Sequence, residues 1–139
     1  MEAFLAVLTD EELRGKVRKK WNGTELNLSY ANIDDAGAKD LARALKQNST
    51  LTTLYLHSNQ IGDAGAKDLA GALGQNSTLT KLNLARNHIG VAGAKDLAGV
   101  LEQNSTLAQL GLDYNNIGDA GAKDLACLLY TSPSPRDRG

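Results

Sequence analysis

The sequence repeats itself with a period of 28 residues. The string Gly-Ala-Lys-Asp-Leu-Ala begins at Gly37, Gly65, Gly93 and Gly121. Residues 54–81 and 82–109 are identical at 19 of 28 positions. Such self-similarity is typical of repeat proteins, in which copies of one supersecondary unit stack and share a continuous core.

Each unit contains one strand pattern followed by one helix pattern. Leu54-Tyr55-Leu56 alternates apolar and polar residues, which predicts a short strand with one buried face. Apolar residues then recur at i, i+3, i+4 and i+7, which predicts a helix with one buried stripe, formed in the second unit by Ala66, Leu69, Ala70 and Leu73. A strand and a crossover helix repeated in series predict an α/β fold, a curved right-handed solenoid with parallel strands.

The residues around each helix start predict how it begins and packs. Asp35, Asp63 and Asp119 immediately precede the apolar stripe, where a carboxylate is expected to cap the same helix. Val91 replaces the aspartate in the third unit, so that helix is expected to begin less firmly, by up to about 1 kcal/mol if nothing replaces the missing cap. The glycines in the first turn of each helix, such as Gly65, predict close packing between neighbouring units. The lysine and aspartate columns on the helices, which begin at Lys39 and Asp40, are expected to be solvated.

The pattern Leu51-x-x-Leu54-x-Leu56-x-x-Asn59-x-Ile61 resembles the leucine-rich repeat. The 28-residue length is similar to the ribonuclease-inhibitor-like subclass, and to the repeat region of cytosolic nucleotide-binding immune-type receptors. The resemblance implies strands on a concave face and helices on a convex face. It also implies a structural ladder of asparagines, which would be Asn59, Asn87 and Asn115.

Three segments are expected along the chain. Residues 1–23 predict a helical cap, in which Thr9 and Glu12 form a capping box and Leu13, Val17 and Trp21 are buried. Residues 24–126 hold four repeats, at 24–53, 54–81, 82–109 and, truncated, 110–126. Residues 127–139 resemble the translation of a transposase-type sequencing adapter, which predicts a non-native tail and a natural protein that continues beyond Ala126. The alternative is a disordered Ser-Pro tail.

The outward positions of the predicted strands differ between copies, although most of each unit is constant. Exposed positions that drift freely would give the same pattern, but a binding face explains it best, because aromatic and arginine residues anchor interfaces. The predicted partner-binding residues are Tyr30, Tyr55, His57, Lys81, Arg86, Asp113 and Tyr114. Arg86 and Tyr114 occupy equivalent positions in adjacent units, which predicts a cation-π contact.

Charge and geometry disfavour other functions. Fifteen basic residues against 16 acidic ones give no net field for nucleic acid, although the basic run from Arg14 to Lys20 keeps nucleic-acid binding as an alternative. His57 and Asp113 would be two strand spacings apart, about 10 Å, whereas a catalytic pair needs about 3 Å. We therefore expect no catalytic site, metal or cofactor.

The sequence favours a cytoplasmic protein. The single cysteine, Cys127, excludes an internal disulfide, and the apolar run from Phe4 to Leu8 is too short to span a membrane. Five Asn-x-Ser/Thr sequences leave secretion as the alternative. We predict a monomeric, non-enzymatic protein-interaction module that is a fragment of a larger receptor or scaffold. A structural or autoinhibitory repeat arm is the main alternative.

Overall fold

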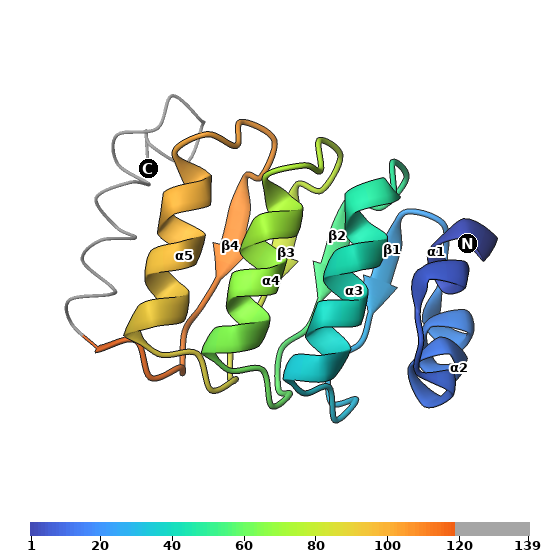
Figure 1. Ribbon diagram of the computed structural model, residues 1–139, viewed down its shortest axis with the longest axis horizontal. Coiled ribbons are helices and arrows are strands. Elements are labelled where there is room, and N and C mark those ends of the chain that lie inside the picture. The colour runs from blue at the N-terminus through green and yellow to red at the C-terminus, as the bar shows by residue number, and fades with distance from the viewer. Residues whose placement is uncertain (119–139) are drawn as a thin grey trace.

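The computed structural model describes residues 1–118, and the helices and strands follow the predicted order (Figure 1). The N-terminal segment holds α1 (Glu2–Val7) and α2 (Glu11–Lys20). The repeats then give β1 (Glu25–Asn27), α3 (Asp35–Gln47), β2 (Thr53–Tyr55), α4 (Asp63–Leu73), β3 (Lys81–Asn83), α5 (Val91–Leu101) and β4 (Gln109–Gly111). The predicted fourth helix, the Asp119 cap and the predicted tail at 127–139 lie outside the described residues.

The strands form one parallel sheet in the order β1-β2-β3-β4. Pairing follows the sequence period, so that Leu26, Leu54, Leu82 and Leu110 lie side by side across the sheet. Helices α3, α4 and α5 form a second layer against one face of the sheet, and each packs on the next (Figure 1). The predicted α/β fold of stacked strand-helix units is therefore present.

The core lies between the sheet and the helix layer. Each unit contributes the same apolar positions, which in the second unit are Leu54, Leu56, Ile61 and Leu69, all fully buried. Their equivalents in the first and third units are also buried. Because the layers are alike, Leu, Ile and Ala fill the core and large aromatic side chains are not needed.

A row of asparagines ties each unit to the one before it. Asn59 Oδ1 accepts hydrogen bonds from the backbone N–H groups of Ala31 and Ile33, at 3.0 and 2.9 Å. Its Nδ2 donates to the carbonyls of Leu28 and Leu56, at 3.0 and 2.9 Å. Asn87 and Asn115 make the equivalent Nδ2 bonds one and two units further on. Buried backbone groups at the end of each strand therefore have partners, which avoids a large desolvation cost.

The turns that follow the helices carry a second row of asparagines. Asn76 Oδ1 accepts from the N–H groups of Thr78 and Leu79, and its Nδ2 donates to the carbonyls of Leu45 and Asn48. Asn76 is only 6% exposed, and its Nδ2 is the atom that a glycan would modify. The Asn-x-Thr sequence at this turn is thus a structural link between units, which argues against glycosylation there.

The helix starts correct one prediction from the sequence. Helix α3 begins after Asp34, whose side chain accepts from the N–H of Gly37. Asp35 is the first helical residue, and its Oδ1 accepts from Gly62 and Gly65 of the next unit, at 2.7 and 3.0 Å. The prediction that this aspartate caps its own helix is wrong, because the cap residue is the one before it and the Asp35 side chain faces the neighbouring unit.

The same relation holds one unit later. Asp63 Oδ1 accepts from Gly90 and Gly93, at 2.7 and 3.0 Å, so α5 begins with a carboxylate partner. The predicted weak start of α5 is therefore wrong, because Asp63 of the preceding unit replaces the missing carboxylate. By the same relation, Val91 would affect the helix start of the following unit. Gly118, the equivalent of Gly90 there, has φ +66° rather than −104°.

The glycine prediction is confirmed. A Cβ atom added to Gly65 would lie 2.7 Å from Asp35 Oδ1, 2.8 Å from Ile61 Cγ2 and 3.0 Å from Ala38 Cβ. Gly93 has the same environment, with Asp63 as the nearest neighbour, at 2.8 Å. The missing side chain is what allows the preceding aspartate to reach the helix start.

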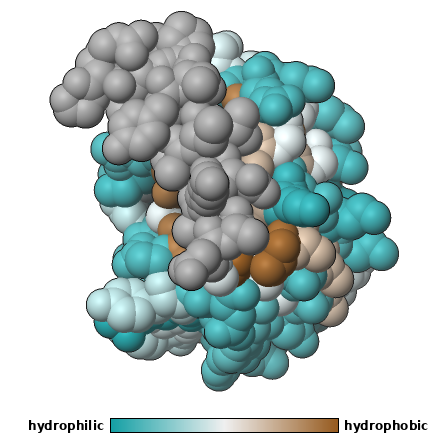
Figure 2. All heavy atoms as spheres, turned by 90° about the vertical axis from the view of Figure 1, so that its left-hand side faces the viewer, coloured by the Kyte–Doolittle hydropathy of each residue, from teal (hydrophilic) through white to brown (hydrophobic). Residues whose placement is uncertain are grey.

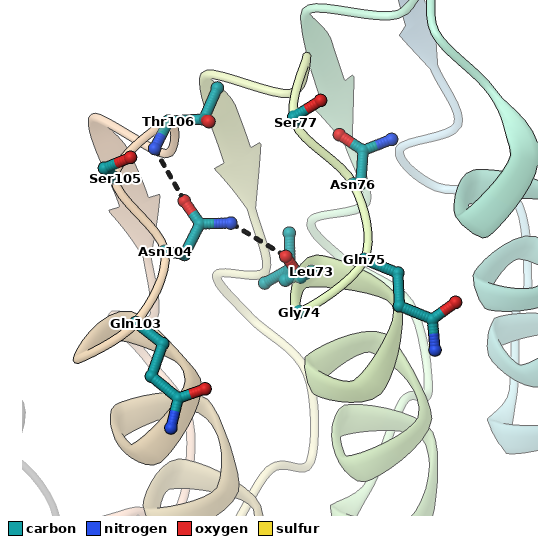
Figure 3. Close-up of a pocket in the computed structure, with 9 residues that line it drawn as sticks. All are labelled: Leu73, Gly74, Gln75, Asn76, Ser77, Gln103, Asn104, Ser105 and Thr106. Atoms are coloured by element: carbon teal, nitrogen blue, oxygen red, sulfur yellow. Dashed lines mark hydrogen bonds between the residues drawn. The ribbon is translucent and has the colours of Figure 1, made fainter.

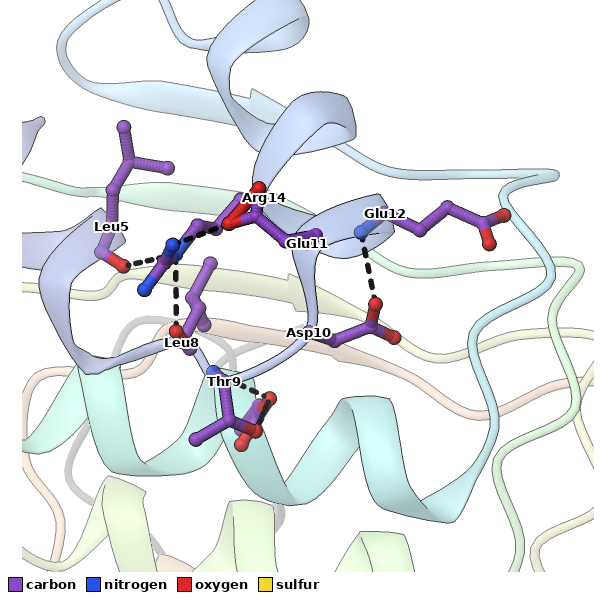
Figure 4. Close-up of polar contacts among 8 residues, drawn as sticks. Leu5, Leu8, Thr9, Asp10, Glu11, Glu12 and Arg14 are labelled. Atoms are coloured by element: carbon purple, nitrogen blue, oxygen red, sulfur yellow. Dashed lines mark hydrogen bonds and ion pairs between the residues drawn. The ribbon is translucent and has the colours of Figure 1, made fainter.

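The N-terminal segment is fastened to α3 by polar contacts (Figure 4). The Thr9 N–H and Oγ1–H both donate to Asp40 Oδ2, at 3.0 and 2.8 Å, and Arg43 Nη1 donates to Asp40 Oδ1 at 3.2 Å. The cap of α2 is Asp10, which accepts from the Glu12 N–H. The predicted Thr9–Glu12 capping box is therefore wrong, because the Thr9 side chain points at α3.

Further contacts close this end of the molecule. Arg14 Nε donates to the carbonyls of Leu5 and Leu8 at the end of α1 (Figure 4). Leu13 and Val17 are buried as predicted, while Trp21 is half-buried, with its ring 5.3 Å from that of Phe4. Asp40 is 6% exposed, so the prediction of a solvated aspartate column is wrong at this position. None of the described helices is long and apolar enough to cross a membrane.

Candidate interaction surface

The surface of the sheet opposite the helices is called the strand face here. It is formed by the outward residues of the four strands, at positions 25, 27, 53, 55, 81, 83, 109 and 111, and by the turns that follow them. Each strand is only three residues long, so the predicted site residues divide between strand and turn. Tyr55 and Lys81 lie on strands, whereas Tyr30, His57, Arg86, Asp113 and Tyr114 lie in the turns.

One turn position has left-handed backbone in every unit. Tyr30, Ser58, Arg86 and Tyr114 are equivalent residues with φ values of 55°, 61°, 55° and 59°. Residues other than glycine rarely adopt this conformation, and it costs on the order of 1 kcal/mol or more. The stacked neighbours hold it: Tyr30, Ser58 and Arg86 donate their backbone N–H to a carbonyl of the next unit.

The predicted contact between Arg86 and Tyr114 is confirmed. The guanidinium carbon lies 4.4 Å from the centre of the tyrosine ring, within the range of a cation-π interaction. Tyr114 remains 71% exposed, so most of the ring is available to a partner. The pair presents a positive charge and an aromatic surface side by side.

A second group of rings lies in the first two units. The Tyr30 and His57 rings meet edge to face with centres 5.7 Å apart, and His57 lies 6.5 Å from the Tyr55 ring. Lys81 Nζ lies over the Tyr55 ring at 5.2 Å. These contacts join the four residues into one cluster. The sequence predicted each of the four as a site residue but not the contacts between them. Tyr30, at the edge of this cluster, is 76% exposed.

The charges of the strand face have no internal ion-pair partners within residues 1–118. The ion pairs in this part of the chain are Arg14–Glu11, Lys16–Glu12 and Arg43–Asp40. They lie in the N-terminal segment and on α3. Lys81, Arg86 and Asp113 are consequently free to pair with charges on another molecule.

A hollow of about 310 Å³ opens between β3 and β4. Lys81, Asn83, Gln109 and Gly111 line it from the outward strand positions. Gly111 lacks the side chain that Asn27, Tyr55 and Asn83 provide at the same position. Asn83, Gln109 and Gly111 are outward positions of the predicted strands, but they were not among the predicted partner-binding residues. The signal in the sequence that could have indicated this hollow is the glycine at an outward position where the other units have a larger side chain.

A second hollow, of about 200 Å³, lies between the turns that follow α4 and α5 (Figure 3). Asn104 lies inside it and donates to the Leu73 carbonyl, while its Oδ1 accepts from the Thr106 N–H. The side chain that points into the space is thus already satisfied by the link between units. This hollow follows from the repeated turn.

The basic α2 helix has fewer free charges than its sequence indicates. Arg14 is bonded to Glu11 and to two backbone carbonyls, and Lys16 Nζ donates to the Ala31 carbonyl. Arg18, Lys19 and Lys20 remain exposed near the end of the helix. This weakens the nucleic-acid alternative, because two of the five cations serve the fold.

Apolar side chains are visible at the surface of the end of the molecule beside α5 (Figure 2). Leu110 and Ile117 are only partly buried there. Their equivalents inside the stack, Leu82 and Ile89, are 1% and 0% exposed. A unit therefore buries its apolar residues through its neighbours, as expected for a repeat protein.

Comparisons with known proteins agree with this architecture. Residues 11–119 match the family model described as the TMOD/LMOD Leucine-rich domain. A solved structure titled "Leiomodin-1 Actin-Binding Site 2 (ABS2)" is similar with a TM-score of 0.72 and 28% identity, over 86% of this chain and 71% of that one. A Caenorhabditis elegans tropomodulin C-terminal domain shares the fold with a TM-score of 0.61 and 15% identity, over 75% of this chain and 62% of that one.

A search of curated proteins found no match. The comparisons support the leucine-rich repeat, but they do not support the ribonuclease-inhibitor-like and immune-receptor subclass that the repeat length indicated. The family match covers both α2 and the stacked units. The chain belongs to the TMOD/LMOD leucine-rich domain family.

Proposed function

We propose that this domain binds another protein on its strand face, and that actin is the first partner to test. The observation that carries the proposal is the similarity to the leiomodin-1 structure, whose title names an actin-binding site. The exposed Arg86–Tyr114 pair and the ring cluster at Tyr30 support the strand face as the contact surface. No catalytic role is proposed.

The proposed contact residues are Tyr30, Tyr55, His57, Lys81, Arg86, Asp113 and Tyr114. Tyrosine and arginine contribute most to protein interfaces when they are buried by a partner. Here Arg86 already lies on the Tyr114 ring and Lys81 on the Tyr55 ring, so less side-chain freedom is lost on binding. The strand face is thus partly organised before a partner arrives.

Cosedimentation with filamentous actin tests the proposal. We expect a variant with Tyr55→Ala, Arg86→Ala and Tyr114→Ala to bind at least about 30-fold more weakly, because a single anchor residue contributes about 2 kcal/mol. The matched control carries Lys39→Ala, Lys67→Ala and Lys95→Ala on the exposed helix surface and should bind normally. Circular dichroism checks that both variants fold.

Two results would contradict the proposal. Equal sedimentation of the wild type and the strand-face variant would remove the strand face as the contact surface. No sedimentation of the wild type at high actin concentration would remove actin as the partner.

We also propose the finer organisation of the molecule. Residues 1–23 would act as a cap, 24–126 as repeats of a right-handed solenoid with a concave strand face, and 127–139 as a non-native tail. The burial of Phe4 and Leu8 in the shared core supports the cap. The buried Asn76 supports a cytoplasmic location over secretion, and we propose that the protein is monomeric.

A further inference from the structure

We propose that the hollow between β3 and β4 binds an acidic side chain of the partner protein, with Lys81 as its counter-ion. The proposal rests on the proposed function, because it names the chemistry of the segment that the strand face receives. The hollow of about 310 Å³ is close to the lower end of the size range of ligand pockets, about 300 Å³. It therefore has room for a side chain and part of its backbone.

The hollow exists because one outward side chain is missing. Gly111 pairs with Asn83 across the sheet, and a Cβ atom on Gly111 would lie 2.8 Å from Asn83 Oδ1. The outward residues at the equivalent positions of the other strands are Asn27, Tyr55 and Asn83, all of which carry side chains. Strand β4 is thus the one of the four strands without a side chain at this position.

Lys81 is the one charged residue that lines the hollow. Its Nζ lies 5.2 Å from the centre of the Tyr55 ring on β2, on the other side of β3, a contact that leaves the ammonium group without a counter-ion. The flexible lysine side chain reaches a ligand in the hollow by turning toward β4. The residues that pair with Lys81 on either side are Thr53 and Gln109, which are uncharged. Within the described chain Lys81 forms no ion pair, so its charge is available to a carboxylate.

The carboxylates of the strand face do not supply a counter-ion to Lys81. Glu25 lies on β1, two strand spacings from β3, which is about 10 Å. Asp113 lies in the turn after β4, in the unit adjacent to Arg86, whose backbone N–H donates to the Asp113 carbonyl. Neither carboxylate lines the hollow. The two basic residues of this part of the strand face are therefore divided, with Lys81 lining the hollow and Arg86 on Tyr114.

The other groups at the rim are suited to the same ligand. Asn83 Oδ1 accepts from the Ala85 N–H, so its Nδ2 is the atom left to donate outward. Gln109 is exposed at the other side and can also donate. The remaining lining includes Ala108, which is exposed, and Leu110, which is partly exposed, and both can contact methylene groups. A glutamate combines methylene groups with an anion, which a free phosphate does not.

Nuclear magnetic resonance with the full chain and a tetraglutamate peptide blocked at both ends tests the proposal. In low salt we expect the amide signals of Lys81, Asn83, Gln109 and Gly111 to shift together. Lys81→Gln should weaken binding about three- to fivefold, since one exposed ion pair is lost, and Lys81→Arg should restore most of it. Gly111→Asn, which fills the hollow with the residue found at position 83, should abolish the shifts. Lys67→Gln on α4 is the matched control and should leave them unchanged.

Three outcomes would overturn the proposal: shifts spread over the helix lysines, shifts that persist in Gly111→Asn, or equal shifts with a tetraglutamine peptide. Equal binding of inorganic phosphate at these amides would also overturn the choice of a carboxylate side chain. The proposed function is tested separately. If the peptide binds in the hollow but the protein does not sediment with actin, actin is wrong and the hollow remains. If actin binds but the peptide shifts fail, only the hollow is removed.

Discussion

Helix α3 and the two helices after it begin in different ways. Helix α3 supplies its own cap, because Asp34 accepts from the Gly37 N–H. At the equivalent position α4 and α5 have Gly62 and Gly90, and their N–H groups donate to an aspartate of the preceding unit. Helix α3 follows the N-terminal segment, which has no aspartate equivalent to Asp35 or Asp63. Its cap therefore comes from Asp34, the residue immediately before it.

The comparison shows that a helix start in this fold belongs to a junction between two units. Asp35 serves the first junction and Asp63 the second, whereas Val91 stands at the third and has no carboxylate. The asparagine row, in contrast, continues through Asn115 at the third junction. All three junctions therefore have the asparagine link, but the aspartate link is present only at the first two.

The largest effect is expected from Asn87→Ala. This substitution removes, at the second junction, the asparagine link that every junction has. Asn87 is 5% exposed, accepts from the Ile61 N–H and donates to the carbonyls of Leu56, Leu84 and Ala85. Leaving these backbone groups unpaired should lower the free energy of unfolding by about 3 kcal/mol. Urea unfolding followed by circular dichroism measures it. A loss below about 1 kcal/mol would mean that water replaces the amide.

The next effect is expected from Gly93→Ala at the second junction. The new Cβ atom would approach Asp63 Oδ1, Ile89 Cγ2 and Ala66 Cβ within 3.0 Å, which should cost about 2 kcal/mol. The control is Gly99→Ala in the same helix, where no heavy atom lies within 4 Å of the added Cβ. This variant should gain about 0.5 to 1 kcal/mol from the higher helix propensity of alanine. Similar effects of the two substitutions on thermal unfolding would contradict the packing role.

Asp63→Ala tests the direction of the carboxylate link. We expect a loss of about 1 to 2 kcal/mol, with faster hydrogen exchange at the Gly90 and Gly93 amides of α5. Asp34→Ala is the matched variant and should instead expose the Gly37 amide of its own helix. If Asp63→Ala loosened mainly the start of α4, the original prediction from the sequence would be right after all.

The smallest effect is expected from Val91→Asp, which would add the missing carboxylate at the third junction. Val91 is 43% exposed, so little apolar burial is lost. We expect a gain of up to about 1 kcal/mol and slower exchange at Gly118, the equivalent of Gly62 and Gly90. Unchanged stability together with an unchanged Gly118 amide would show that the third junction does not use this link.

The sequence period was sufficient to predict the strands, the helices, the core and the close packing at Gly65. It was not sufficient to predict which helix Asp35 serves. In a stacked array the start of the next helix is as near as the start of the same one, and a shift of one residue separates the two roles. The choice depends on side-chain direction, which periodicity does not contain.

Long-range contacts explain the other differences. Thr9 and Glu12 have the spacing of a capping box, but Asp40 lies 31 residues away and takes both Thr9 donors. For the candidate site, equivalent positions predicted the Arg86–Tyr114 contact. The hollow beside Gly111 was missed because it depends on an absent side chain beside the longer Asn83.

The left-handed turn positions have a consequence for engineering. Tyr30, Arg86 and Tyr114 hold a conformation that glycine adopts freely. Glycine at these three positions should relax the backbone and make the fold easier to maintain, while it removes the rings and the guanidinium that we propose meet the partner. Stability selection alone would then drive the domain toward a well-folded but non-binding form, so variants should be selected for folding and for binding together.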